Sequence, residues 1–486
     1  MRIVHVAAEL APIAKVGGLA DVLLGLSRAL SEKKHDVEII LPKYDCLDLK
    51  AIENLQVAVH DLPTFFAGKS HHNTIWQGRV GGIKTTFIES HDLNNFFARK
   101  TIYGAPDDPA RFSYFCRAAL EYLLKCRQKI DILHLHDWHT AMVALLYQDL
   151  YQPQGLKCSK VMFTIHNLAY EGVCKREILT QAGLSTRRFE LIKDENQPRS
   201  INLLKCGIVC ADTITTVSPN YAKEILDPKE NGFLNKVVTR WKKKFIGVLN
   251  GIDYTYWNPE NDPHLPFHYS ANNVSQALKI KKKLKAHLRQ TLSLADEECP
   301  IVCAITRLVP QKGPELIKQA IFRTLEKGGQ FVLLGSALDP KTHEEFYKLK
   351  RKLAGSDHVH LELTYNEPLS HLVYAASDLF LVPSIFEPCG LTPMVAMRYG
   401  TIPLVRKTGG LIDIIRDEEN GFAFGPPTTE GIYSALDRAL GCWFNHPQKW
   451  KRIVETGMQQ DWSWNQPAEE YLKIYHENSV AVTEFS

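Results

Sequence analysis

A glutamate inside a turn-forming segment is the residue of this chain best suited to chemistry. Glu387 lies in Pro383-Ser-Ile-Phe-Glu-Pro-Cys-Gly-Leu-Thr392, directly after a short apolar run typical of a strand. Ligands of open α/β sheets bind at the carboxyl ends of strands, so this position favours a functional carboxylate over a capped surface turn. The proline and glycine favour a turn, after which residues 391–397 can begin a helix whose first N–H groups suit a phosphate. The pattern predicts one carboxylate beside an anion-binding helix start.

Two basic residues follow another predicted strand. The run Ile301-Val-Cys-Ala-Ile305 leads into Thr306-Arg-Leu-Val-Pro-Gln-Lys-Gly313, which places Arg307 and Lys312 on one loop. A guanidinium can hold a phosphate with two parallel hydrogen bonds, and an ammonium acts as a point charge. Two basic residues are common on surface loops, but this loop falls at a strand end of the same predicted sheet as Glu387. We therefore expect the pair to neutralise a diphosphate.

A Lys-x-Gly-Gly-Leu motif occurs twice, as Lys15-Val-Gly-Gly-Leu19 and as Lys407-Thr-Gly-Gly-Leu411. Each copy follows an apolar run and opens a segment with helical periodicity. Paired glycines let backbone N–H groups approach a ligand, and a helix N-terminus favours anions. A single copy is equally well explained as a tight turn with a surface lysine. Two copies in matching contexts predict two facing α/β domains that bind a phosphate-bearing ligand between them.

Histidines and an aspartate gather after two strands of the first half. His136-Asp-Trp-His-Thr140 follows one predicted strand, and His166-Asn-Leu168 follows the next. Polar groups for hydroxyls beside an aromatic face are typical of a sugar site. A metal site formed by His134, His136 and His139 is the alternative, since strand alternation puts the first two on one face. No carboxylate–histidine pattern of a known type completes such a site, which favours the sugar.

Short β-branched runs alternate with longer helical patterns throughout the chain, which predicts parallel sheets with helices on both faces. One series of runs ends near Asn250-Gly-Ile-Asp253, and a second begins at Ile301. We expect two Rossmann-like, doubly wound domains at residues 1–250 and 251–460, followed by a helix at 461–486. The lysine-rich run 279–285 carries leucine and isoleucine at helical spacing, which favours a solvated amphipathic helix over a nucleic-acid patch.

Composition excludes several classes of function. The 486 residues are 45% hydrophobic and 23% charged, with a formal net charge of only +4. This balance is ordinary for a globular protein and gives no support to a nucleic-acid or membrane partner. No apolar run approaches the length of ~18 residues that a membrane helix needs, and no leader precedes the first strand. The 11 cysteines are scattered and odd in number, as in reduced proteins, so we expect a cytoplasmic location.

As a set, these motifs resemble bacterial and plant glycogen (starch) synthases, retaining α-glucosyltransferases of the two-domain GT-B fold. The matching segments are 15–21, 136–140, 166–168, 250–253, 307–313, 387–392 and 407–411, in order over nearly the whole chain. The resemblance implies transfer of glucose from a nucleotide-glucose to the non-reducing end of an α-1,4-glucan. ADP-glucose is favoured over UDP-glucose by family habit alone. The resemblance also implies a C-terminal helix that crosses back to the N-terminal domain.

The resemblance further implies roles for individual residues. The implied catalytic residues are Glu387, His166, Lys15, Arg307 and Lys312. The implied donor-binding residues are Lys15, Gly17, Gly18, Asn250, Arg307, Lys312, Tyr365, Cys389, Gly390, Leu391 and Thr392, with Tyr365 packing on the base. The implied acceptor-side residues are Asp137, His139, Asp21 and Tyr103. No cofactor and no metal are expected, and the oligomeric state is left open.

One departure from related enzymes bears on mechanism. Many retaining enzymes of this fold carry a second glutamate eight positions after the first, and that position here is Val395. Retaining glycosidases use two carboxylates, one of them as nucleophile. With one well-placed carboxylate, we expect front-face transfer, in which the acceptor attacks from the side that the diphosphate leaves.

Three other functions fit parts of the pattern. A nicotinamide-dependent oxidoreductase would place a ribose-binding acid near Glu38, but the first loop lacks the G-x-G-x-x-G spacing. A non-catalytic glucan- or nucleotide-binding protein would be expected to lose Glu387, Lys15 or the basic pair, and all are present. A glucan phosphorylase shares the architecture but needs a pyridoxal-phosphate lysine and usually a longer chain.

Overall fold

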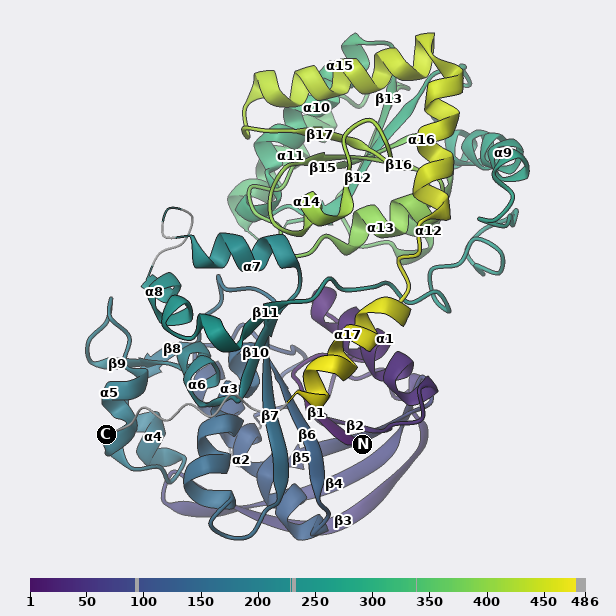
Figure 1. Cartoon of the computed structure of the whole chain (residues 1–486). Coiled ribbons are helices and arrows are strands. Elements are labelled where there is room, and N and C mark those ends of the chain that lie inside the picture. Colours follow the sequence, from purple (N-terminus) through teal and green to yellow (C-terminus); the bar gives the residue numbers. More distant parts are fainter. Residues whose placement is uncertain (92–95, 228, 230–232, 338, 478–486) are drawn as a thin grey trace. The chain divides into compact units, whose positions relative to one another are not determined.

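The computed structural model describes residues 1–91, 96–227, 229, 233–337 and 339–477. The chain forms two compact units, one of Met1–Gly251 with Trp464–Ser486 and one of Ile252–Ser463 (Figure 1). The first division lies beside the boundary expected at residues 250 and 251, and the second lies three residues beyond the one expected at 460 and 461. Within the described ranges, no helix is long and apolar enough to cross a membrane.

The first unit is built on a nine-stranded sheet in the order β11-β10-β7-β6-β1-β2-β5-β4-β3 (Figure 1). Its strands are β1 (Arg2–Val6), β2 (Asp36–Pro42), β3 (Glu53–Phe66), β4 (Lys69–Val80), β5 (Ile83–Ser90), β6 (Ile130–His136), β7 (Cys158–Ile165), β10 (Thr213–Thr216) and β11 (Phe245–Gly247). The predicted parallel sheet is confirmed for β1, β2, β5, β6, β7, β10 and β11. A hairpin of β3 and β4 extends it with antiparallel pairs, which the sequence analysis did not anticipate.

Helices of the first unit bury their apolar stripes on this sheet. In α1 (Gly18–Glu32) the residues with spacing i, i+3, i+4 and i+7, among them Leu19, Val22, Leu23 and Leu26, are all buried. The others of the unit are α2 (Asp108–Cys126), α3 (Asp137–Leu146), α4 (Glu177–Gln181), α5 (Phe189–Ile192), α6 (Leu203–Cys210), α7 (Pro219–Leu226), α8 (Phe233–Arg240) and α17 (Asn465–His476). A two-stranded sheet of β8 (Val173–Lys175) and β9 (Ser200–Asn202) lies apart from the main sheet. The thiols of Cys206 and Cys210, four residues apart on α6, are both buried in the core.

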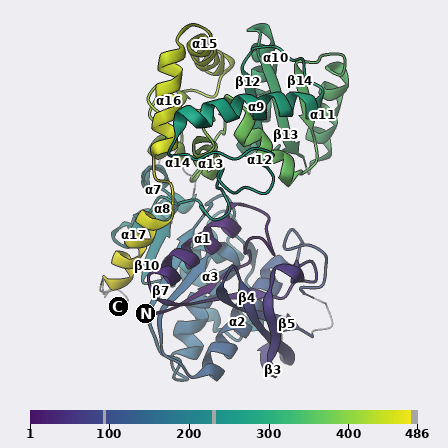
Figure 2. The same cartoon turned by 90° about the vertical axis from the view of Figure 1, so that its right-hand side faces the viewer.

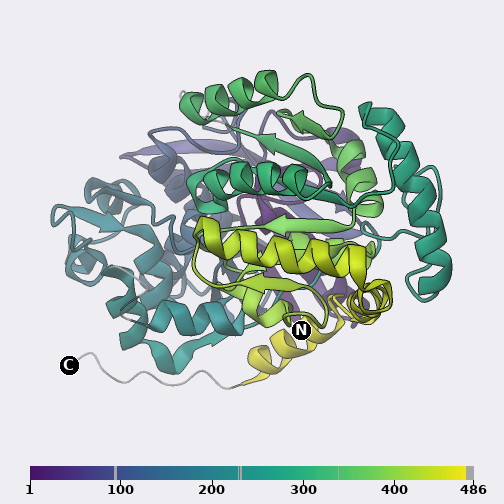
Figure 3. The ribbon, with the colours of Figure 1, turned by 90° about the horizontal axis from the view of Figure 1, so that it is seen from above.

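The C-terminal helix α17 belongs to the first unit, which confirms the predicted return of the chain. It lies alongside α1 (Figures 1 and 2), and the yellow helix near the N label in Figure 3 is the same segment. A Cβ on Gly25 of α1 would lie 2.0 Å from Nε1 of Trp464, so the glycine makes room for this indole. The buried ammonium of Lys160 donates to the carbonyl oxygens of Ile474 and Glu477, which caps the end of the helix.

The second unit contains a six-stranded, fully parallel sheet in the order β14-β13-β12-β15-β16-β17. Its strands are β12 (Ile301–Arg307), β13 (Gln330–Ser336), β14 (Val359–Glu362), β15 (Leu379–Val382), β16 (Ile402–Arg406) and β17 (Phe422–Phe424). Its helices are α9 (Val274–Leu292), α10 (Pro314–Glu326), α11 (Pro340–Lys352), α12 (Glu367–Ala376), α13 (Leu391–Arg398), α14 (Gly410–Ile414), α15 (Thr429–Asn445) and α16 (Pro447–Gln459). The lysine-rich run expected to be helical lies within α9.

Strand order determines where each unit can bind a ligand. In the first unit the chain runs outward from β1 through β2 to one edge and from β6 through β7 to the other. In the second unit the corresponding change of direction falls between β12 and β15. Loops diverge at such a switch point and leave a crevice at the carboxyl ends of the strands. The loops that follow β1, β6, β12 and β15 are therefore the expected site loops, and all four carry the motifs singled out above.

Candidate active site

The loop after β1 is shaped by a buried carboxylate. Oε2 of Glu9, a residue only 3% exposed, accepts the backbone N–H groups of Val16 and Gly17, each at 2.8 Å. Two N–H donors on one carboxylate oxygen fix the Gly-Gly turn at the start of α1. A Cβ on Gly17 would meet no atom within 4 Å, so space remains beside the turn for a ligand to approach the backbone. Glu9 thus orders the loop that displays Lys15 and Gly18, both exposed.

The predicted acceptor-side residues of the first unit contact two different groups. Asp21 contacts the predicted donor loop, because its Oδ1 accepts a hydrogen bond from Nζ of Lys15 at 2.8 Å. Tyr103 donates its hydroxyl to Oε1 of Glu9 at 2.8 Å, and its ring lies 5.0 Å from that of His139. Glu9 therefore links the Lys15 loop to Tyr103 and, through that ring, to His139.

Asp137 joins the ends of β6 and β7. Its Oδ1 accepts the backbone N–H of His166 at 2.7 Å and that of Asn167 at 3.4 Å. Asp137 adopts the left-handed conformation (φ 55°), which turns the chain from β6 into α3. Burial raises the pKa of Asp137 to about 7, although the two N–H donors act in the opposite direction. The predicted Asp137 and His166 are thus in direct contact in the first unit.

Five histidines of the first unit are almost fully buried and lack a carboxylate partner among the described contacts: His5, His134, His136, His139 and His166. Burial lowers the pKa of His5, His139 and His166 to about 3, and lowers those of His134 and His136 well below the ordinary value. The imidazoles are therefore neutral at pH 7. Each offers one donor and one acceptor to its surroundings.

The three histidines whose ligand atoms lie close enough for a metal differ from the three considered in the sequence analysis. His5, His134 and His136 hold ligand atoms within 4.8 Å of one another, whereas His139 stacks on Trp138. The ring of His136 lies 4.4 Å from that of His134 at 27° and 5.3 Å from that of His5 at 24°. Lone pairs lie in the ring planes, so stacked imidazoles direct them side by side instead of toward one ion. This arrangement suits hydrogen bonding better than metal ligation.

The second unit brings Lys312 and Glu387 into direct contact. Nζ of Lys312 lies 2.5 Å from Oε2 of Glu387, and the hydroxyl of Ser384 donates to the same oxygen at 2.8 Å. The Glu387 side chain is 10% exposed and that of Lys312 21%. Two donors on one carboxylate oxygen hold the side chain of Glu387 in one orientation.

The loops after β12 and β15 are fastened to each other by their backbones. The N–H of Ile385 donates to the carbonyl oxygen of Gln311 at 2.7 Å, and Nε2 of Gln311 donates to that of Phe386 at 3.2 Å. Gly313 has φ +66°, and a Cβ there would lie 2.5 Å from the carbonyl oxygen of Pro383. Glycine is therefore required where the two loops touch, and this close approach brings Lys312 to Glu387.

The second Gly-Gly loop supports the Glu387 turn. A Cβ on Gly409, which has φ +48°, would lie 1.9 Å from the carbonyl oxygen of Glu387, and the N–H of Gly410 donates to that oxygen at 3.0 Å. The helix expected after this motif is present as α14, but it has only five residues. The glycines allow close backbone packing against the Glu387 turn, and so short a helix gives no support to the anion-binding role expected for this copy.

Other predicted donor residues surround these contacts or lie at nearby strand ends. Cys389 and Gly390 continue the turn, and Leu391 and Thr392 open α13 as expected. Arg307 is the last residue of β12. Tyr365 follows β14 and is 72% exposed. Asn250 is the residue before Gly251, where the first segment of the first unit ends, and it is buried with no bonding partner for Oδ1 among the described residues.

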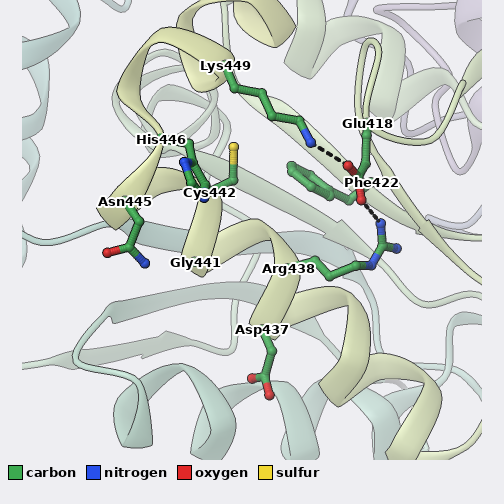
Figure 4. A pocket seen from close by; sticks show the side chains of 9 residues that line it. All are labelled: Glu418, Phe422, Asp437, Arg438, Gly441, Cys442, Asn445, His446 and Lys449. Atoms are coloured by element: carbon green, nitrogen blue, oxygen red, sulfur yellow. Dashed lines mark hydrogen bonds and ion pairs between the residues drawn. The ribbon is translucent and has the colours of Figure 1, made fainter.

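A hollow of about 290 Å³ in the second unit lies elsewhere (Figure 4). It is lined by residues of α15, α16, the residue between these helices, β17 and the turn before β17, and it includes neither Lys312 nor Glu387. Glu418 accepts from both Arg438 and Lys449, each at 2.5 Å, as the dashed lines of Figure 4 show. Because its cations are already paired, this hollow is a poor anion site.

Three site residues escaped the sequence analysis: Glu9, Ser384 and His136 as a partner of His166. Ser384 stands three residues before Glu387 and could have been found as a local hydroxyl donor. Glu9 lies beyond the end of β1, where an acid is informative, but nothing local predicts that it turns back to the Gly17 N–H. The His136–His166 contact joins residues 30 positions apart and has no sequence signal.

Comparisons with known proteins cover nearly the whole chain. A model of the starch synthase catalytic domain matches residues 2–240, and one of glycosyl transferases group 1 matches residues 289–457. A glycogen synthase of Protochlamydia amoebophila is 50% identical, with 98% of this chain and 99% of the relative covered. Glycogen synthase 2 of Methylococcus capsulatus is 46% identical, with 97% and 99% covered.

Two solved structures are also similar to this chain. The catalytic domain of starch synthase IV from Arabidopsis thaliana, bound to ADP and acarbose, superposes with a TM-score of 0.94 at 46% identity, with 98% of both chains covered. A sucrose-phosphate synthase from Thermosynechococcus elongatus has a TM-score of 0.63 at 17% identity, a likeness of fold alone.

Proposed function

This chain belongs to the glycogen and starch synthase family, and on that premise we propose that ADP-glucose is its preferred donor and that Glu387 and Lys312 are central to the transfer. The enzyme is a hexosyltransferase that moves glucose, with retention, from a nucleotide-glucose to the non-reducing end of an α-1,4-glucan. The observation that carries the residue assignment is the carboxylate of Glu387, held by Ser384 and Lys312 at a sheet switch point.

The preference for ADP-glucose is supported by the relative with 46% identity that binds ADP and acarbose. The exposed ring of Tyr365 suits stacking on a nucleobase, which is worth roughly 1–3 kcal/mol per base. A tyrosine stacks on adenine and uracil alike, so the ring alone does not select the base. UDP-glucose is therefore the alternative donor.

In this proposal, positively charged side chains stabilise the departing diphosphate. Arg307 and Lys312 lie at the end of β12 and on the following turn, and Lys15 stands on the ordered loop after β1. They would offset the negative charge that develops on the diphosphate as it departs. Leu391 and Thr392, at the start of the eight-residue helix α13, would add backbone N–H donors.

Transfer on one face needs only one carboxylate. The bond from glucose C1 to the phosphate oxygen breaks, and the acceptor 4-hydroxyl forms the new bond to C1 from the same side. The hydroxyl proton passes to the departing phosphate oxygen, so no second side chain is required as a base. Glu387 favours the cationic, sugar-like transition state, and Val395, buried in α13, occupies the position of a second glutamate.

The proposal includes no metal, because the lysines and the arginine supply the charge that a divalent ion would otherwise provide. Activity should therefore persist in EDTA. Loss of transfer in EDTA with recovery on addition of Mg²⁺ would contradict this part of the proposal.

The test is incorporation of labelled glucose into glycogen with ADP-glucose and UDP-glucose offered separately at equal concentration. We expect incorporation from both or from ADP-glucose alone, with the higher kcat/KM for ADP-glucose. A higher kcat/KM for UDP-glucose would overturn the donor preference. A Glu387→Ala enzyme with wild-type turnover would remove the carboxylate from the mechanism.

A further inference from the structure

Three buried histidines form a hydrogen-bonded row that ends at the predicted sugar-binding side chain. Nδ1 of His5 lies 3.0 Å from Nε2 of His136, and Nδ1 of His136 lies 3.0 Å from Nε2 of His166. The row starts on β1, passes through the last residue of β6 and reaches the residue after β7. These strands are neighbours in the order β7-β6-β1, so the sheet itself holds the rings in line.

Each ring of the row is neutral, so the hydrogen bonds of the row run in one of two possible directions. The three residues are at most 9% exposed, and burial lowers their pKa values below the physiological range. A neutral imidazole carries one N–H and one lone pair. Each ring of the row must therefore donate through one nitrogen and accept through the other, so all three share one direction.

The free end of the row indicates that direction. Nε2 of His5 is buried and has no hydrogen-bond partner among the described residues. If the row donated toward His5, this nitrogen would carry a buried N–H without an acceptor, which is rare and costs about 1–3 kcal/mol. If the row donates toward His166, the same nitrogen holds only a lone pair. Donation therefore runs from His5 Nδ1 to His136 Nε2, and from His136 Nδ1 to His166 Nε2.

We infer that His5 and His136 are positioning residues that hold His166 in its Nδ1–H tautomer, so that its ring presents a hydrogen-bond donor to a hydroxyl of the transferred sugar. The inference rests on the proposed function and on the sugar site that the sequence predicts at His166. No described residue bonds Nδ1 of His166, so this N–H is available to a ligand. With the other tautomer, the ring would offer a lone pair at the same place and accept a hydroxyl proton.

The backbone of His166 is fixed separately, which leaves the row to control the ring. Oδ1 of Asp137 accepts the His166 N–H at 2.7 Å and so sets the position of the chain. The row then sets the rotation and the tautomer of the side chain. Two independent anchors are what a donor needs if it is to meet one hydroxyl in one geometry.

His134 is the matched control for this inference. It is also fully buried and stacks on His136 at 4.4 Å, but its nitrogens bond to Tyr475 and Thr164 and not to the row. Replacing it perturbs the same part of the core without removing a link. A role that is only structural would therefore affect His134 and His136 variants alike.

The experiment compares His136→Leu, His136→Asn and His134→Gln with the wild type. The amide nitrogen of asparagine lies near the place of Nδ1 and can still donate to His166, whereas leucine cannot. For His136→Leu we expect kcat for glucose transfer to fall by up to about 10²-fold, with ADP affinity unchanged, because ADP carries no glucose. The His136→Asn enzyme should recover most of the loss, and His134→Gln should keep the wild-type kcat.

A spectroscopic measurement reads the tautomer directly. In protein labelled with ¹⁵N-histidine, the signals of His166 should show a proton on Nδ1 and a lone pair on Nε2 in the wild type. Loss of this pattern in His136→Leu is the expected result. A proton on Nε2 of His166 in the wild type would overturn the inference, as would equal kcat in His136→Leu and the wild type.

A second pair of variants keeps the test decisive if His136→Leu does not fold. His5→Asn retains a donor near the place of Nδ1 and His5→Leu removes it, so the asparagine enzyme should have the higher kcat. Equal kcat for the two would refute the row. Failure of the wild type to transfer glucose from any nucleotide-glucose, with the Nδ1–H signal present, would count against the proposed function and not against the row.

Discussion

The Lys312–Glu387 contact offers the sharpest test of the second unit, because this ion pair joins the two loops to which we assign the chemistry. Lys312→Met removes the cation and keeps the length of the side chain. Glu387→Gln removes the negative charge and keeps both the volume and an oxygen that can accept from Ser384. The double variant completes a cycle in which the coupling between the two side chains is measured separately from their other roles.

The magnitude follows from distance and burial. The two charged atoms lie 2.5 Å apart, with side chains 21% and 10% exposed, so the pair lies between the surface and buried classes. Surface pairs are worth about 0–1 kcal/mol, and removal of one partner of a buried pair costs about 3–5 kcal/mol. We expect each single variant to lower the free energy of unfolding of the second unit by about 2 kcal/mol. The double variant should cost about the same as one single variant.

Turnover is the second readout. Loss of one preorganised charge at the transition state should lower kcat by about 10²–10³-fold, so Glu387→Gln is expected to be nearly inactive although folded. Denaturant unfolding and initial rates of glucose incorporation measure the two effects. Glu345→Gln is the matched control, since Glu345, whose side chain is 38% exposed, pairs with Lys318 at 2.7 Å in the same unit. Strictly additive stability losses would show that the ion pair does not exist in solution, and unchanged kcat in Glu387→Gln would refute the catalytic role.

Three further predictions concern the first unit. Glu9→Gln removes the negative charge and leaves one oxygen to accept either the two N–H groups of the Gly-Gly turn or the Tyr103 hydroxyl. We therefore expect kcat/KM for the nucleotide-glucose to fall by about 10-fold or more while circular dichroism is unchanged, and wild-type kinetics would separate this carboxylate from the site. The five buried histidines bind protons below pH 6.5 in the unfolded chain but not in the folded one, so the free energy of unfolding falls as the pH falls from 6.5 toward 3. The proton that folded Asp137 binds opposes this loss, and the net slope is at most ~5 kcal/mol per pH unit. His134→Gln should reduce the slope by the contribution of one proton, and an unchanged slope would contradict this account. Lys160→Met leaves the carbonyl oxygens at the end of α17 without their donor and should lower the free energy of unfolding by about 1–3 kcal/mol. An equal loss in the surface variant Lys157→Met would show that the Lys160 hydrogen bonds do not contribute to stability.

The local parts of the site could be predicted from the sequence. Arg307, Lys312 and Glu387 each follow an apolar run, and parallel strands place their carboxyl ends at one edge of a sheet. Turn chemistry at Pro388 and Gly390 indicated the start of α13 to the residue. Such features depend on a few consecutive residues, whose backbone preferences are nearly the same in an isolated segment as in the folded protein.

Only the tertiary structure decided which of these residues touch and what supports them. Glu9 turns back to the Gly17 N–H, and the row from His5 to His166 joins residues of three strands that the chain order separates. The short α14, placed under the carbonyl oxygen of Glu387, likewise follows from packing against another loop. These contacts depend on strand order, register and close backbone approach between distant segments. A spacing along the chain contains no information on them, whereas the side-chain types that make the chemistry possible are written in the sequence itself.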